Sequence, residues 1–164
     1  MKALLLIAAG LLALQDIDNP EYQRWAACKV GSWVKMKSEI EVAGNKIAVP
    51  NTMTVTLMEL DEKQAVVEQV LTNEIDSAAS EKPKKRTYKA KLRKKESNEK
   101  EGDEEIEVAG KKMTCHWVEV TAAAGSSKTW THPDVPGGTV RLEIVAGADK
   151  SRVTRLYATA WEKK

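Results

Sequence analysis

The peptide Glu-Ile-Glu-Val-Ala-Gly occupies residues 39–44 and recurs at residues 105–110, and a shorter copy, Glu-Ile-Val-Ala-Gly, occupies residues 143–147. Each copy is an extended run that ends in an Ala-Gly pair typical of a turn, and a second β-rich stretch follows within a few residues. The copies begin at unequal intervals, which excludes the fixed period of a solenoid or a propeller. The repeated peptide therefore predicts three hairpins within one antiparallel sheet.

The residues around the first copy extend this pattern. Residues 33–42 alternate between apolar and charged side chains, as in a half-buried strand. Two further pairs of β-rich runs, residues 52–58 with 65–71 and residues 139–145 with 152–161, are joined by short polar connections that favour hairpins. The Asn19-Pro20-Glu21 sequence is typical of a helix start. We therefore expect a mainly β protein, an antiparallel meander with one short N-terminal helix.

The N-terminus has the order of a secretory signal. Lys2 precedes an apolar run, residues 3–14, and a polar segment follows it. This apolar run is shorter than the roughly 20 residues needed to cross a bilayer, so a transmembrane helix is not predicted. We expect residues 1–15 to be a signal peptide, without a clear cleavage site, and residues 16–164 to be a single β-rich domain exported to the periplasm or secreted.

The charged residues balance over the whole chain but not along it. The 26 basic and 24 acidic residues give a net charge of +2, which offers no argument for nucleic-acid binding. In residues 76–104 a basic block precedes an acidic one, and this order predicts an exposed hairpin insertion whose basic strand lies opposite its acidic strand. The alternative is an arm that contacts anionic surfaces. Its candidate residues are Lys89, Lys91, Arg93 and Lys94.

The two cysteines, Cys28 and Cys115, would meet an oxidising environment after export, where paired thiols tend to form a bridge. We expect a Cys28–Cys115 disulfide, which would stabilise the fold by about 4 kcal/mol through loop closure. Two separate buried thiols are the alternative. A zinc site that adds His116 and His132 is not expected, because no pair of these residues has the close spacing of structural zinc sites.

The sequence carries no signature of an enzyme. It has neither a phosphate-binding glycine loop nor a dinucleotide-binding motif, so we expect no cofactor. Of the two histidines, His116 lies in an apolar strand and is expected in the core. His132 lies near Asp134, and a hydrolase that uses His132 is the remaining catalytic alternative, although no strained nucleophile turn is present.

Five tryptophans and no phenylalanine make the aromatic composition unusual. Tryptophan combines a large apolar area with an N–H donor, which suits a core edge or the lip of a groove. Trp130 precedes a loop rich in proline and glycine and is the tryptophan expected to be exposed. The predicted ligand or partner contacts are therefore Trp130, His132, Pro136, Gly137 and Gly138.

Three short motifs carry a resemblance to a group of small exported bacterial proteins without assigned activity. They are Trp-x-x-Cys-x-x-Gly-Ser-Trp-Val at residues 25–34, Gly-Lys-Lys-Met-Thr-Cys-His-Trp-Val-Glu at residues 110–119 and Val-Pro-Gly-Gly at residues 135–138. That group is similar in length and strand plan to the lipoprotein-carrier and lipoprotein-receptor half-barrels of the bacterial envelope. The resemblance implies a curved sheet, a half-barrel or open barrel, with an apolar concavity for acyl chains.

Together these features predict an exported, non-catalytic protein that binds a lipid or acylated ligand on the apolar face of a curved sheet. The alternative is an envelope structural or interaction module with a packed core, whose lysine-rich hairpin contacts an anionic surface or a protein partner.

Overall fold

The computed structural model of the protein describes residues 16–76, 81–93, 98–146 and 152–164. The elements of the first half are β1 (Asp16–Asp18), α1 (Pro20–Ala26), β2 (Trp33–Val42), β3 (Asn45–Leu60), β4 (Gln64–Asn73), β5 (Lys84–Lys89) and β6 (Lys91–Arg93). Those of the second half are β7 (Glu99–Val108), β8 (Lys111–Ala122), β9 (Gly125–Thr131), β10 (Thr139–Ala146) and β11 (Arg152–Glu162).

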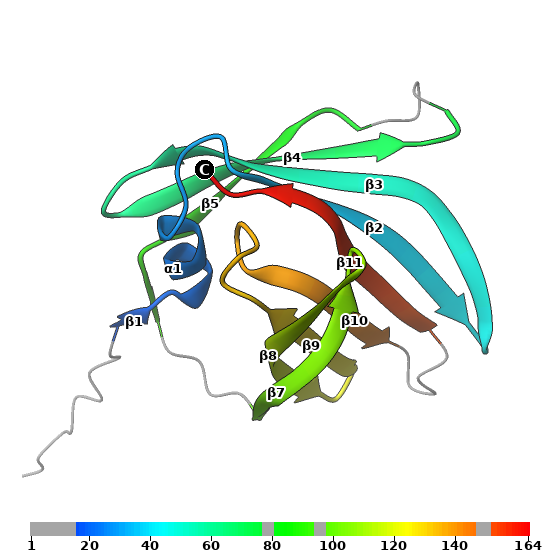
Figure 1. Ribbon diagram of the computed structural model, residues 1–164. Helices are drawn as coiled ribbons and strands as arrows, with labels where there is room; N and C mark the ends of the chain where they lie inside the picture. The colour runs from blue at the N-terminus through cyan, green and yellow to red at the C-terminus, as the bar shows by residue number, and fades with distance from the viewer. Residues whose placement is uncertain (1–15, 77–80, 94–97, 147–151) are drawn as a thin grey trace, which may run out of the picture.

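Nine of the strands in these ranges form one antiparallel sheet in the order β5-β4-β3-β2-β11-β10-β9-β8-β7, and β1 pairs separately with β6 (Figure 1). The sheet is curved and does not close into a barrel. The predicted mainly β fold, a curved antiparallel meander with one short N-terminal helix, is confirmed. Strands that are neighbours in this sheet follow one another in the sequence, except that the last strand, β11, pairs with β2 and joins the two halves in the middle.

The repeated peptide forms the predicted hairpin turns at its first two copies. Ala43 and Gly44 connect β2 to β3 with φ angles of 49° and 82°, and Ala109 and Gly110 connect β7 to β8 with φ angles of 49° and 76°. Two successive positive φ angles define the type I′ turn, whose twist matches that of the flanking strands. β10 and β11 pair as the predicted final hairpin, although Gly147 of the third copy lies outside the described residues.

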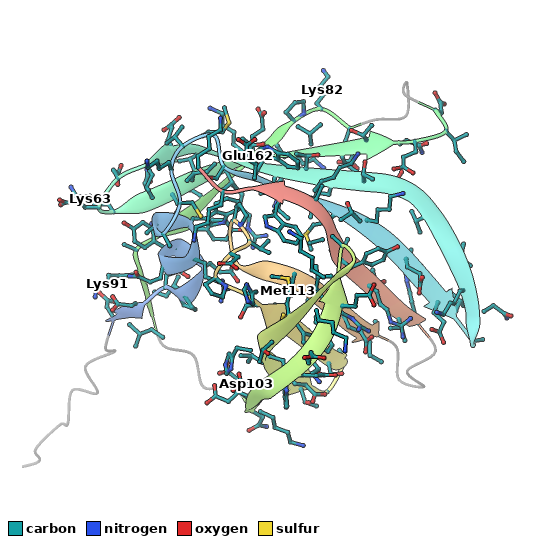
Figure 2. The ribbon with its side chains drawn as sticks, viewed as in Figure 1. Lys63, Lys82, Lys91, Asp103, Met113 and Glu162 are labelled. Atoms are coloured by element: carbon teal, nitrogen blue, oxygen red, sulfur yellow. The ribbon has the colours of Figure 1, made fainter. Side chains whose placement is uncertain are left out.

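The predicted charged hairpin is wrong. The basic strand β5 pairs with β4 and the acidic strand β7 pairs with β8, so the two blocks lie at opposite edges of the sheet. Figure 2 accordingly shows Lys82, just before β5, and Asp103, in β7, on opposite sides of the molecule. The reason is burial: Tyr88 and Ile106 each pack against the core, and exposed ion pairs of at most about 1 kcal/mol do not outweigh that.

The helix begins as the sequence predicts. The Asn19 side chain accepts a hydrogen bond from the Glu21 backbone N–H at 3.0 Å and donates one to the Lys89 carbonyl at 2.7 Å, which ties the start of α1 to β5. A seven-residue helix is not stable alone, so α1 depends on its buried Tyr22 and Trp25. In Figure 1, α1 lies against the β2–β5 half of the sheet near the β3–β4 turn, and the far ends of β2 and β3 extend beyond it.

The predicted Cys28–Cys115 disulfide is absent, and both residues are free buried thiols. Cys28 follows α1, and its Sγ donates to the Arg24 carbonyl 3.5 Å away in the same helix. Cys115 lies in β8 opposite Glu104 of β7. Burial, together with the negative charge of Glu104, raises the pKa of the Cys115 thiol. The structure therefore has the alternative arrangement of two separate thiols, because the helix and β8 orient them toward different neighbours.

Candidate functional site

One face of the sheet carries a groove with a volume of about 300 Å³. Its apolar floor and walls come from four strands: Val34 and Met36 of β2, Met53 and Val55 of β3, Leu142 of β10 and Leu156 of β11. Val34 pairs with Val55 and Met36 pairs with Met53. Residues opposite each other in an antiparallel pair point to the same face, so the alternation within each strand assembles one apolar surface.

Helix α1 and the loop between β9 and β10 close one end of the groove. Trp25 from the helix and Pro136 and Gly137 from the loop all line it. Gly137 has a φ of 70°, and a Cβ placed there would lie 2.6 Å from the Trp25 ring. The loop therefore passes directly under the indole, which requires glycine at this position. Two predicted contact residues, Pro136 and Gly137, thus border the groove, although both are buried against the helix.

Polar side chains surround the mouth of the groove, namely Glu21, Gln69, Arg86, Tyr88 and Thr129. The Arg86 guanidinium lies 5.1 Å from the centre of the Tyr88 ring, a cation–π distance. Burial raises the pKa of Tyr88, and the nearby charge of Arg86 opposes this shift only in part, so the phenol remains neutral at physiological pH. The groove thus combines an apolar floor with a polar mouth, as small-molecule sites commonly do.

A second hollow, of about 470 Å³, lies between α1 and the strands β7 to β9, and it contains both histidines and Gly138. His132 Nδ1 accepts a hydrogen bond from the Asp134 backbone N–H at 3.2 Å, and the Asp134 carboxylate is 3.8 Å away. In a Ser-His-Asp triad the histidine instead donates its Nδ1–H to a carboxylate. Here Nδ1 accepts a hydrogen bond, which stabilises the turn and favours the neutral imidazole with its proton on Nε2. Among the described residues, no group of three or more metal-binding side chains is present.

His116 differs from its prediction. It is exposed rather than buried in the core, and its Nδ1 lies 3.1 Å from the Asp103 carboxylate across the β7–β8 pair. The side chains of β8 alternate between faces, so the apolar neighbours Cys115 and Trp117 point to the opposite side from His116.

The prediction that Trp130 is an exposed contact is wrong, because its side chain is buried. Its Nε1 donates to Glu104 at 2.9 Å, while Lys128 and Arg141 lie over its ring at 4.6 and 4.7 Å. The hydrogen bond from the indole is the main cause of a lowered pKa at Glu104. Trp130 therefore anchors β9 to β7 and is not among the residues that line the groove or the second hollow.

Of the four predicted anionic-surface residues, the structure describes the side chains of Lys89 and Lys91. Lys89 is exposed in β5, while Lys91 lies in β6 with its Nζ 2.5 Å from the Asp18 carboxylate of β1. The Arg93 side chain and Lys94 lie outside the part of the chain that the structure describes.

Sequence reasoning missed the most informative polar groups of the groove. Arg86 was not singled out because the neighbour of its strand was unknown, and Gln69 was not because the predicted hairpin did not show which cavity it borders. The residue pattern of β5 does not identify its partner strand, which is β4.

Helix α1 is far too short and too polar to cross a membrane, and no other helix within the described ranges could do so.

No protein-family profile matches the chain, and no curated protein sequence matches it. Solved structures that are similar to it include the following two. One is a protein from Bacteroides fragilis NCTC 9343 that is inferred to be exported and has a YmcC-like fold. Its TM-score with this chain is 0.58 at 8% sequence identity, and the match covers 83% of this chain and 97% of that one. The other is an inferred lipoprotein from Parabacteroides distasonis ATCC 8503, with a TM-score of 0.51, 12% identity, and coverage of 82% and 96%. At these identities the likeness shows a shared fold.

Proposed function

We propose that this protein is an exported, non-catalytic binding protein that holds the acyl chain of a lipid or acylated ligand in the groove. The observation that carries the proposal is the apolar lining that four strands and α1 present to one cavity of about 300 Å³. That volume lies at the lower end of the roughly 300–1,000 Å³ of small-molecule sites. It suits one chain, and each methylene transferred from water into such a site contributes about 0.8 kcal/mol.

The apolar surface continues beyond the groove and supports a long, flexible occupant. Val42 lies on the same face of β2 as Met36, and Ile144 lies on the same face of β10 as Leu142, because side chains alternate along a strand. Both residues therefore extend the groove face toward the end that α1 does not cover. Both side chains are exposed, at 40% and 39%. An extended hydrocarbon chain would cover them, whereas a compact ligand would not reach them.

Binding is tested with a fatty acid that carries an environment-sensitive fluorophore. Met53→Glu places a carboxylate on the groove wall, and because an unpaired charge is costly in an apolar site, we expect the affinity to fall at least about tenfold. The matched control is Met58→Glu, which makes the same change on the same strand at an exposed side chain outside the groove. We expect this control to bind as the wild type does.

Circular dichroism and thermal unfolding of both variants show whether the fold is retained, and if Met53→Glu unfolds, Leu142→Gln on β10 replaces it. A wild-type protein that binds no acyl probe would overturn the proposal and favour the packed interaction module. Equal loss of binding in the two glutamate variants would also contradict it, because the site would then not be the groove.

Export is the second component of the proposal. It is supported by the apolar run at residues 3–14 and by the two similar structures, one inferred to be exported and one an inferred lipoprotein. Expression of the full chain in a Gram-negative host should yield a periplasmic or secreted protein whose mass is lower by about that of the first 15 residues. A full-length protein confined to the cytoplasm would contradict export without affecting the binding test.

A further inference from the structure

The groove mouth holds a cation, Arg86, that has no acidic partner among the residues that the structure describes. Arg86 lies in the edge strand β5, is exposed, and contacts the Tyr88 ring through its guanidinium. Within the described part of the chain, no carboxylate lies within ion-pairing distance of Arg86. Glu21, which also lines the mouth, is paired with Arg24 at 2.5 Å. Among the described residues that line the groove, Arg86 is therefore the charged side chain left available to a molecule that enters it.

The surroundings of Arg86 add to this positive charge. A shallow hollow of about 200 Å³ shares Met53 and Gln69 with the groove and is lined by Lys82 and Lys84. Glu81 also borders this hollow and is paired with Lys84. The apolar floor thus leads outward to a rim on which basic side chains predominate.

The alternation of β5 explains why these cations face the groove. Lys84 pairs with Gln69 and Arg86 pairs with Val67, so both share the face of the β4 residue that lines the groove. Lys85 has the opposite parity and lies 3.9 Å from Glu59. Strand β5 therefore carries basic side chains on both faces. Those on the face of Lys84 and Arg86 are directed toward the apolar cavity, and Lys85 is on the other face.

We infer that the ligand is an anionic amphiphile, whose carboxylate or phosphate group binds Arg86 while its hydrocarbon chain occupies the groove. This inference rests on the proposed function. A guanidinium offers a planar pair of N–H donors that matches two oxygens of either anion, and such charge-assisted hydrogen bonds are stronger than neutral ones. The contact at the mouth also fixes which end of the chain enters first.

The experiment compares three ligands of equal chain length, namely dodecanoate, dodecyl phosphate and dodecanol, each by competition against the fluorescent fatty acid. We expect the wild type to bind at least one of the two anions about tenfold or more tightly than the alcohol, with a difference that shrinks as salt is added. Arg86→Gln should abolish this preference while the alcohol binds as before. Arg86→Lys should retain part of it, because an ammonium lacks the planar pair of donors.

Lys85→Gln is the matched control, since it removes one charge from the same strand on the face away from the groove and should leave the preference intact. The order of the two anions identifies the source, a fatty acid or a phospholipid-type headgroup. Equal binding of all three ligands, unchanged by Arg86→Gln, would overturn this inference and leave the groove as an acyl site. Failure of all three to bind the wild type would instead overturn the proposed function.

Discussion

Replacing Trp25 by alanine is expected to lower the free energy of unfolding by about 3–5 kcal/mol, measured by chemical denaturation. The indole is buried, and it packs α1 against the sheet and against the loop at Gly137. The helix has only seven residues, so its place depends on Trp25 together with the buried Tyr22 and the hydrogen bonds of Asn19. Since domains of this size are stable by roughly 5–15 kcal/mol, the loss is a large fraction of the total. The variant should also bind the acyl probe more weakly, because the closed end of the groove is lost.

Trp33→Ala is the control for this prediction. It removes the same side chain at a half-buried site where the indole Nε1 donates to Glu162 at the surface, so a smaller loss of about 1 kcal/mol is expected. Gly137→Ala approaches the contact from the other side, and the new Cβ would overlap the Trp25 ring. In a double-mutant cycle, Gly137→Ala should cost less in the Trp25→Ala background, because the overlap is gone. Strict additivity, or a Trp25→Ala effect no larger than that of Trp33→Ala, would contradict this account.

Arg155→Gln is expected to destabilise the fold by about 2 kcal/mol. Arg155 of β11 lies between carboxylates of both neighbouring strands, with Nη1 2.8 Å from Glu41, Nε 2.8 Å from Glu143 and Nη1 3.5 Å from Glu39. The hydrogen bonds to Glu41, and then to Glu143, raise the pKa of Arg155, so it stays charged at any pH at which the protein is studied. Loss of this cation leaves Glu41 facing Glu39 and Glu143, which keep Lys46 at 3.7 Å and Arg141 at 3.3 Å as their cations. These side chains are about a quarter exposed, so we expect less than the 3–5 kcal/mol of a fully buried pair.

The control for this second prediction is Arg152→Gln, at the exposed start of the same strand, which should change stability by no more than about 0.5 kcal/mol. Two further measurements isolate the repulsion among the acids. High salt should reduce the deficit of Arg155→Gln, and adding Glu143→Gln should recover part of it. If Arg155→Gln unfolds at the same denaturant concentration as Arg152→Gln, the cluster does not hold the centre of the sheet together.

The strands and turns were predicted well because their signals are local. The alternation in residues 33–42 predicted β2 with the bounds it has, and the Asn19-Pro20-Glu21 sequence predicted the start of α1. The two Ala-Gly pairs at residues 43–44 and 109–110 adopt the turns that the repeated peptide indicated. Each of these features depends on backbone preferences and side-chain periodicity within a few residues, which any short window of the sequence contains.

The candidate site was predicted only in outline. The apolar alternation indicated a sheet with one apolar face, and the loop residues Pro136 and Gly137 do border the groove. The prediction of an exposed Trp130 and that of a Cys28–Cys115 disulfide were wrong, because each depends on which parts of the folded chain the side chain contacts. In the sequence Arg86 is one of many basic residues. Only the folded structure shows that it lies beside an apolar cavity.

The amino-acid sequence was therefore sufficient for the class of fold, its hairpins and its helix start. The pairing of β11 with β2, the separation of the basic and acidic strands to opposite edges and the assembly of the groove required the folded chain. The physical reason is that hydrophobic burial is non-directional and acts between segments far apart in the sequence, as when Trp25, Val55 and Val140 join one buried cluster. Alternation of apolar and polar residues indicates that a strand has an apolar face. Which surface packs against that face is decided only when the whole chain folds.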